Sequence, residues 1–126
     1  MRFMVLVKAS EQTEAGVLPS AELLAKMGLF NEELVRAGVL LAADGLQPTS
    51  KGARISFAGP HPTVTDGPFT ETKELIAGYW LLQLKSKGEA IERLSRAPFD
   101  SGEEIEIRQV YEAEDFAPVF AQTEKG

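Results

Sequence analysis

The chain has 126 residues, no cysteine, and a formal net charge of −6 from 13 basic and 19 acidic residues. This length suits a single domain with its own core, and the missing cysteine excludes disulfides, thiolate nucleophiles and cysteine-based metal sites. The negative charge disfavours nucleic acid, and one histidine, His61, leaves little with which to build a zinc site. We therefore expect a protein that binds no nucleic acid, metal or cofactor.

Membrane insertion is also disfavoured by the sequence. No apolar run approaches the roughly 20 residues that a membrane-spanning helix needs. The opening stretch, residues 1–8, is too short and is followed too soon by polar residues to be a signal peptide. We interpret it as a strand and expect the protein to be soluble, cytoplasmic and without a membrane partner.

Apolar spacing and capping signals predict seven main elements. Residues 3–7 are apolar at every position, which is typical of a strand buried on both faces. Ser20 is a favoured helix N-cap, and Gly38 a favoured helix end. Residues 9–19 are expected to form a polar loop. In chain order the pattern predicts a strand over residues 3–7, a helix over 20–38, a strand over 39–43 and a small hairpin over 53–65. A strand over 76–84, a helix over 86–98 that a capping box at Ser86 and Glu89 opens, and a last strand over 104–111 follow.

Without its hairpin, this order is the ferredoxin-like split βαβ pattern of the α+β class. In that topology the first and third main strands are central, and these are the two strands that are apolar on both faces. Two helices cover only one face of such a sheet. The other face, which carries either Met4, Leu6, Tyr79 and Leu81 or the residues on the opposite side of the same strands, would then be exposed and would mark an interface. We expect a homodimer formed by this sheet face, a dimeric α+β barrel.

Four ordered stretches resemble the DGPF branch of the YCII-related family. They are residues 2–7, 30–40, 44–48 and 65–74, the last reading Thr65-Asp66-Gly67-Pro68-Phe69-Thr70-Glu71-Thr72-Lys73-Glu74 and leading into Gly78-Tyr79-Trp80. The resemblance covers residues 1–111 and implies a dimeric barrel of ferredoxin-like halves with a cleft near the Asp66-Gly67-Pro68-Phe69 turn. We divide the single domain, residues 1–126, into this core and a C-terminal arm over residues 112–126.

The resemblance also implies two points about function. Some family members carry an early histidine that is paired with an aspartate and proposed for acid–base chemistry, but no histidine lies between Ser20 and Ala37 here. Any acid–base role would therefore fall on carboxylates. Related proteins are often encoded beside extracytoplasmic-function sigma factors, which suggests a link to sigma-factor regulation.

The candidate site is built around the turn. Asp66 and Glu71 are the candidate catalytic carboxylates, held beside a rigid Gly-Pro turn. Aromatic side chains close to the turn would supply an apolar pocket. The candidate ligand-binding residues are Glu33, Gly67, Pro68, Phe69, Lys73, Tyr79 and Trp80.

Each candidate also has a purely structural interpretation. Asp66 could form an Asx-turn, and Glu71 and Lys73 could be a solvated charged loop. Glu33 could pair with Arg36 or Arg54 at the surface. The aromatic residues could be core or interface, and His61, between two prolines, is typical of an exposed loop.

Two functions remain open at this point. The first is a homodimer that binds an unknown small molecule near the turn, with cofactor-free acid–base catalysis by carboxylates as a possible extension. The alternative is a non-catalytic regulatory or protein-interaction module, for which the apolar residues Phe116, Val119 and Phe120 of the C-terminal arm would supply a docking surface.

Overall fold

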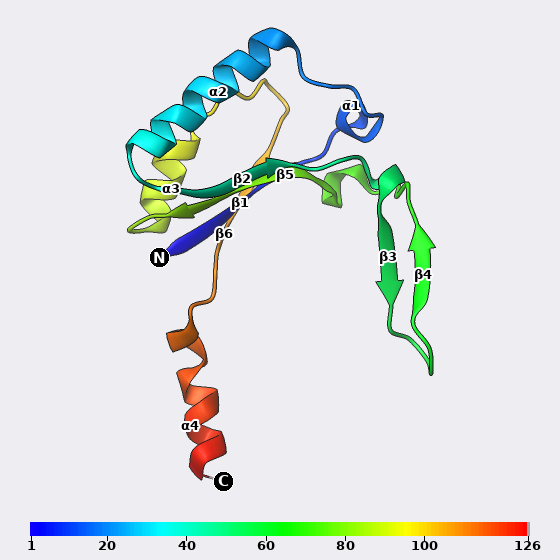
Figure 1. Ribbon diagram of the computed structural model, residues 1–126, viewed down its shortest axis with the longest axis vertical. Helices are drawn as coiled ribbons and strands as arrows, with labels where there is room; N and C mark the ends of the chain where they lie inside the picture. Colours follow the sequence, from blue (N-terminus) through cyan, green and yellow to red (C-terminus); the bar gives the residue numbers. More distant parts are fainter. Residues whose placement is uncertain (126) are drawn as a thin grey trace.

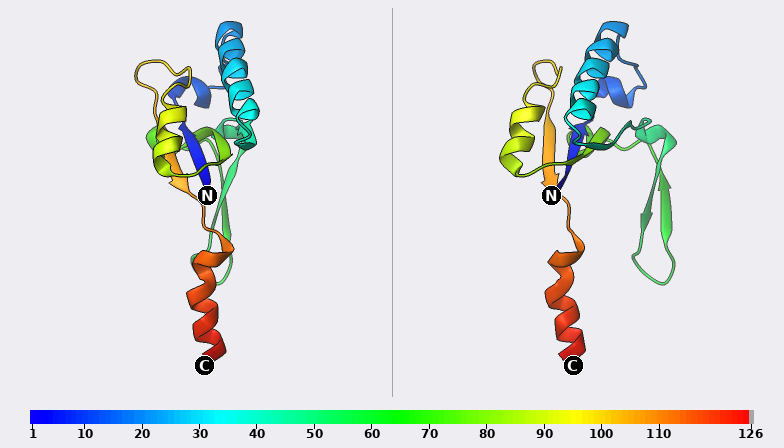
Figure 2. Two further views of the ribbon diagram at one scale, coloured as in Figure 1. Left: turned by 90° about the vertical axis from the view of Figure 1, so that its left-hand side faces the viewer. Right: turned by 60° about the vertical axis from the view of Figure 1, so that its left-hand side comes forward.

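The computed structural model describes the chain over residues 1–125, with side chains described as far as Gln122. Helices lie on one face of a sheet, while a hairpin and the C-terminal helix project from the other side (Figures 1 and 2). The helices and strands are β1 Arg2–Lys8, α1 Glu11–Glu14, α2 Ala21–Arg36, β2 Leu40–Gly45, β3 Ala53–Ser56, β4 Thr63–Asp66, β5 Ile76–Gln83, α3 Lys87–Leu94, β6 Ile105–Gln109 and α4 Ala117–Lys125, with 3₁₀ turns η1 Thr49–Lys51, η2 Thr72–Glu74 and η3 Ala113–Phe116.

The main sheet has the strand order β2-β5-β1-β6, with every neighbouring pair antiparallel. The two central strands, β1 and β5, are the first and third main strands, as the ferredoxin-like pattern requires. Strands β3 and β4, which follow β2 and precede β5 in the sequence, form a separate two-stranded sheet. The predicted α+β class and split βαβ order are therefore confirmed. Within the described residues, the four strands of the main sheet form an open sheet and not a closed barrel.

The hydrophobic core lies between this sheet and helices α2 and α3. Phe3 and Val5 of β1 and Leu82 of β5 are almost fully buried, and they pack in one cluster with Phe30 and Leu34 of α2. Each such side chain stabilises the fold by roughly 1.5–3 kcal/mol relative to exposure. The alternation of side chains along β1 and β5 is therefore what fixes α2 over the sheet.

The expected helix boundaries are mostly found. The Ser20 hydroxyl accepts a hydrogen bond from the Leu23 N–H at 3.1 Å, and Gly38, with φ of +72°, closes the end of α2. The Ser86 hydroxyl accepts from the Glu89 N–H at 3.1 Å. The reciprocal bond of the predicted capping box is absent from the described residues, because the Glu89 carboxylate lies beside Arg93, 3.9 Å away.

The prediction of a plain loop over residues 9–19 was wrong. A short helix, α1, forms there because Ser10 and Thr13 cap it reciprocally. The Ser10 hydroxyl accepts from the Thr13 N–H at 3.2 Å, and the Thr13 hydroxyl accepts from the Ser10 N–H at 2.8 Å. A capping box usually has glutamate or glutamine three residues after the N-cap, whereas this one has Thr13, so the motif is not recognised from the sequence.

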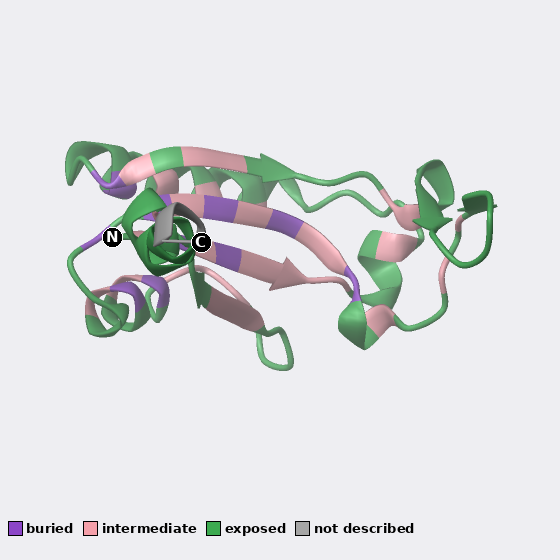
Figure 3. Cartoon of the chain, turned by 90° about the horizontal axis from the view of Figure 1, so that it is seen from below, coloured by how far each residue is buried: buried purple, intermediate pink, exposed green. Residues whose placement is uncertain are grey.

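The face of the sheet that points away from α2 and α3 is only half-buried. Figure 3 shows this side, on which Met4, Leu6, Tyr79 and Leu81 lie in pairs across β1 and β5. Within one chain, β1 is therefore fully buried on one face and not on both, because the two helices pack on the same side. We call the surface around these four residues the open face.

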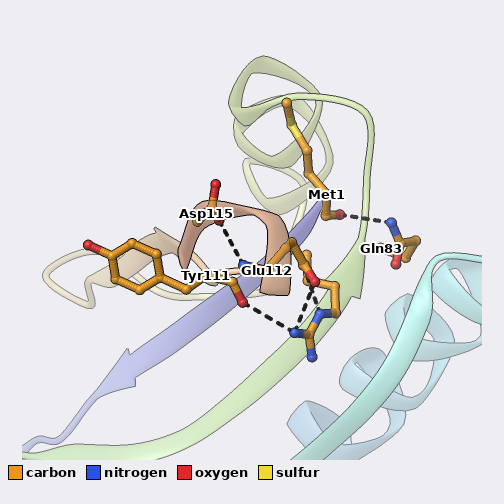
Figure 4. A network of polar contacts seen from close by, with 6 residues as sticks. Met1, Gln83, Tyr111, Glu112 and Asp115 are labelled. Carbon is orange, nitrogen blue, oxygen red and sulfur yellow. Dashed lines mark hydrogen bonds and ion pairs between the residues drawn. The ribbon is translucent and has the colours of Figure 1, made fainter. Parts of the chain in front are cut away.

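The C-terminal arm begins at a fixed point on the edge of the sheet. The Arg2 guanidinium donates to both carboxylate oxygens of Glu112, at 2.9 and 3.2 Å, and to the Tyr111 carbonyl at 3.4 Å (Figure 4). The Glu112 N–H donates in turn to Asp115 at 2.7 Å. Beyond this point η3 and α4 project from the open side of the sheet (Figures 1 and 2). The predicted frayed end at Gly126 lies outside the described residues.

The ion pair at the base of the arm should make stability depend on pH. The hydrogen bond from Arg2 lowers the pKa of Glu112 below its ordinary value of 4.5. The contribution of the pair is therefore fully present above about pH 4.5 and is lost as the pH falls through the lower pKa of the folded state. We expect Glu112→Gln to lower the melting temperature at pH 7 and to differ much less from wild type near pH 3. Thermal melts should show no such pH-dependent difference for Glu114→Gln, a matched change two residues further on, within η3.

Candidate functional site

A cavity of about 340 Å³ lies between the first half of α2 and the sheet. Strands β2 and β5 form its floor, and the segments before α2 and after α3 contribute to its rim. Its size falls in the range of small-molecule sites, and apolar side chains supply most of its wall. The lining residues are Val7, Thr13, Pro19, Leu23, Leu24, Met27, Asn31, Ala43, Asp44, Gly45, Ala77, Gly78, Tyr79, Trp80, Phe99 and Glu103.

Trp80 is the central side chain of the cavity wall. It is only 4% exposed, and its ring meets Phe30 and Phe99 edge-on, with centroid distances of 5.8 and 6.0 Å. The indole N–H donates to Asn31 Oδ1 at 2.8 Å. Because an indole N–H can only donate, this bond fixes the orientation of the Asn31 amide. The Asn31 NH₂ group, which has no partner among the described residues, remains available as a donor.

A second polar pair, Tyr79 and Asp44, lies on the face of the sheet opposite to the Trp80 side chain. The Tyr79 hydroxyl donates to Asp44 Oδ2 at 2.9 Å, across the pairing of β5 with β2. The hydrogen bond to Asp44 and the negative charge of its carboxylate raise the pKa of Tyr79 above 10.0. Tyr79 therefore keeps its proton at neutral pH and acts there as a hydrogen-bond donor, not as a base.

A shallower hollow lies beside the Asp66-Gly67-Pro68-Phe69 turn. It has a volume of about 470 Å³, and Phe69, Arg54, Lys51 and Glu74 are among its lining residues. The Arg54 guanidinium stacks on the Phe69 ring, 3.8 Å from its centroid, and lies 3.7 Å from the Glu71 carboxylate. This hollow adjoins the first cavity. Leu46 and Ile76 line the hollow, and their neighbours in the sequence, Gly45 and Ala77, line the cavity.

The turn itself is held by hydrogen bonds and by close packing against Thr49. The Phe69 N–H donates to the Thr49 hydroxyl at 3.0 Å, and the Thr49 hydroxyl and N–H both bond to the Glu14 carboxylate. Gly67 donates its N–H to the Gly52 carbonyl at 3.1 Å and is joined to Pro68 by a cis peptide bond. A Cβ at Gly67 would overlap the Thr49 carbonyl, so only glycine fits.

The structure divides the predicted site residues between several places. Trp80 and Tyr79 line the first cavity, and Phe69 lines the second hollow. Both candidate catalytic carboxylates, Asp66 and Glu71, are exposed and line neither. The same holds for the remaining predicted ligand-binding residues Glu33, Gly67, Pro68 and Lys73, of which Gly67 is half-buried and the others are exposed.

The structural interpretations have mixed outcomes. The Asp66 carboxylate makes no hydrogen bond within the described residues, so the Asx-turn is absent and the Gly67 packing shapes the turn instead. Arg36 and Arg54 pair with Glu32 and Glu71, at 3.8 and 3.7 Å, and not with Glu33. His61 is exposed in the hairpin loop, as expected.

Sequence reasoning missed Asn31, the residue that joins α2 to Trp80. A signal was present, because asparagine is a poor residue for the interior of a helix. Asn31 also lies four positions after Met27 and thus on the apolar side of α2. Thr13 and Glu103 at the rim were also missed, since neither lies in a recognisable pattern.

The strand order and the core define a ferredoxin-like α+β protein, and a cavity of ligand size lies under its first long helix. The sequence model of the YCII-related domain matches residues 1–114, and the chain belongs to the YCII-related family.

Similarity to individual proteins extends to a curated relative and to a solved structure. The first is Uncharacterized protein R00369 of Rhizobium meliloti (strain 1021), 33% identical over 66 residues, which is 52% of this chain and 53% of that protein. The chain thus matches about half the length of this relative. The second is 5-chloro-2-hydroxyhydroquinone dehydrochlorinase (TftG) from Burkholderia phenoliruptrix AC1100, in complex with 2,5-dihydroxybenzoquinone. That match covers 90% of this chain and 98% of the other, with 13% identity and a TM-score of 0.44. A likeness at this level says nothing about the reaction.

Among the side chains that the structure describes, as far as Gln122, histidine, aspartate and glutamate do not gather in any group of three that could hold a metal ion. No helix within residues 1–125 has the length and apolar character needed to cross a membrane.

The fit of Gly67 against Thr49 gives a test of how the turn is held. We expect Gly67→Ala to lower the free energy of unfolding by about 1–3 kcal/mol, because the backbone must shift to relieve the overlap. Gly28→Ala is the matched control. Its Cβ would meet nothing within 4 Å in the middle of α2, so it should stabilise the protein by about 1 kcal/mol. Urea denaturation measures both, and an unchanged Gly67→Ala midpoint would contradict this account.

Proposed function

We propose that the protein binds a small, mainly apolar molecule in the cavity between α2 and the sheet. The observation that carries this proposal is the Trp80–Asn31 hydrogen bond, which orients an amide donor in an otherwise apolar wall. Small-molecule sites are usually built in this way, with a large apolar surface and a few fixed polar groups.

The wall indicates the chemical class of the ligand. Trp80, Phe30 and Phe99 meet edge to face, and Trp80 and Phe99 present aromatic surface that favours a flat ring. The Asn31 NH₂ group donates into the cavity, so the ligand would carry an acceptor oxygen, such as a carbonyl or a phenolate. We therefore propose a ring-sized molecule with at least one acceptor oxygen.

The proposal is one of binding and not of catalysis. The predicted catalytic pair, Asp66 and Glu71, lies outside the cavity and is exposed. An acid–base role for that pair therefore receives no support from the cavity.

Trp80 is the only tryptophan of the chain, so its fluorescence reports directly on the cavity. We expect simple hydroxylated or carbonyl-bearing ring compounds to change this fluorescence saturably. A compound present at a hundred times its Kd should also stabilise the protein by about 2.7 kcal/mol. Asn31→Leu should weaken binding about tenfold or more, because the donor is lost.

Asp66→Asn is the matched variant for the competing site at the turn. Binding that persists in Asp66→Asn and weakens in Asn31→Leu would support the cavity under α2. Binding that is lost in Asp66→Asn and kept in Asn31→Leu would place the ligand beside the turn and overturn the proposal. Because Asn31→Leu also removes the partner of Trp80, its urea midpoint must be measured to show that it is folded.

We also propose that two copies pair through their open faces. Met4, Leu6, Tyr79 and Leu81 lie together there, half-buried in one chain, and no helix or strand among the described residues packs over them. Apolar surface of this kind usually marks an interface. A second copy would bury it without any additional component.

Sedimentation velocity tests this pairing. We expect wild type to sediment as a dimer at micromolar concentration and Leu6→Lys to sediment as a monomer, because a lysine would be buried without a partner. Leu29→Lys, on the exposed side of α2, should leave the dimer intact. A monomeric wild type, or a Leu6→Lys dimer as tight as wild type, would contradict the proposal.

A further inference from the structure

Two projections stand on the open side of the sheet, one at each end. Helix α4 leaves the end where β1 begins, and the β3–β4 hairpin leaves the end where β1 finishes (Figures 1 and 3). Between them they enclose the open face. A second copy seated on the open face must therefore fit between its partner's helix and hairpin.

Both projections carry exposed apolar side chains. Ile55 and Val64 are paired across the hairpin and are 58% and 63% exposed, and Phe57 beside them is 81% exposed. On the arm, Phe120 is 63% exposed. A lone two-stranded hairpin and a helix of nine residues are each marginal in water without packing. Each therefore lacks the apolar contact that the other could supply.

Within one chain the two projections cannot meet, because the whole length of the sheet separates them (Figure 3). Their reach is sufficient to meet across a dimer. Facing sheets lie about 10 Å apart, whereas α4 is about 13 Å long from its nine residues. The four-residue strands of the hairpin are also about 13 Å long.

The projections indicate how the second copy is oriented. The ion pairs of the open face join Arg2 to Glu112, and Glu106 to both Lys8 and Arg108, so these charges are not separated between the two ends. A copy reversed end for end places each α4 at the end of its partner's sheet from which the hairpin projects. The opposite orientation would place both α4 helices in the same space.

From this reversed orientation we infer that α4 of each copy packs against the β3–β4 hairpin of the other, with Phe120 on the Ile55–Val64 face. The inference rests on the proposed dimer and goes beyond it, since it assigns a role to both projections. Because a two-fold interface is reciprocal, two such contacts form at once. Each chain thereby clasps the sheet of its partner at both ends.

The lack of cysteine makes site-directed cross-linking a clean test. Full-length Phe120→Cys and Val64→Cys chains, each with a different affinity tag, are co-expressed, purified through both tags and treated with a short bis-maleimide. We expect a covalent heterodimer, with the linked peptides identified by mass spectrometry. Phe120→Cys with Leu29→Cys is the control, because Leu29 is equally exposed but lies in the helix layer. The control yield should be several-fold lower.

The outcomes separate this inference from the dimer on which it rests. A dimer in sedimentation with preferential Val64 cross-linking supports it. A dimer that cross-links at Val64 no better than at Leu29 overturns the clasp and leaves the open-face pairing standing. A monomeric wild type overturns both. As a second readout, Phe120→Asp should raise the dimer Kd by at least about tenfold, as loss of a buried aromatic contact does, and an unchanged Kd would contradict the inference.

Discussion

The packing of Trp80 is the constraint on which the cavity and much of the core depend. Trp80 lies on the central strand β5, contacts Phe30 of α2 and Phe99 after α3 with its ring edges, and donates its indole hydrogen to Asn31. Trp80 thus fixes α2 to the sheet and holds the segment after α3 against them. It also orients the Asn31 amide that faces the cavity. A buried indole N–H without an acceptor would cost about 1–3 kcal/mol, so Asn31 is needed for stability as well as for the shape of the site.

Most of the fold could be predicted from the sequence because it follows from local rules. The alternation along residues 76–84 places Trp80 and Leu82 on one face, and Ser20 and Gly38 bound α2 through a cap and a positive φ. The strand order then follows from the pattern of elements. The short helix α1 could not be predicted in this way, because its capping bonds join Ser10 to a threonine that no common pattern singles out.

The site was harder to predict because its parts are distant in sequence. The residues around Asp66 form a compact sequence signature, but what the structure explains in that signature is mainly packing, with Gly67 pressed on Thr49 and Phe69 under Arg54. The cavity instead joins Asn31 to Trp80, 49 positions away. Only the tertiary structure brings these two together, and neither residue forms part of a catalytic motif. A conspicuous turn can therefore be structural while a single asparagine in a helix forms the polar point of the pocket.

The most direct test of the account is the NMR signal of the one indole N–H in the chain. In a ¹⁵N-labelled protein, the resonance of Trp80 Nε1–H and the side-chain amide resonances of Asn31 should shift together when a ring compound with an acceptor oxygen is titrated in. That result would place the ligand at the Trp80–Asn31 pair. A compound that binds, shifts the resonances around Phe69 and Arg54 and leaves both side-chain signals unmoved would contradict the account and place the site at the turn.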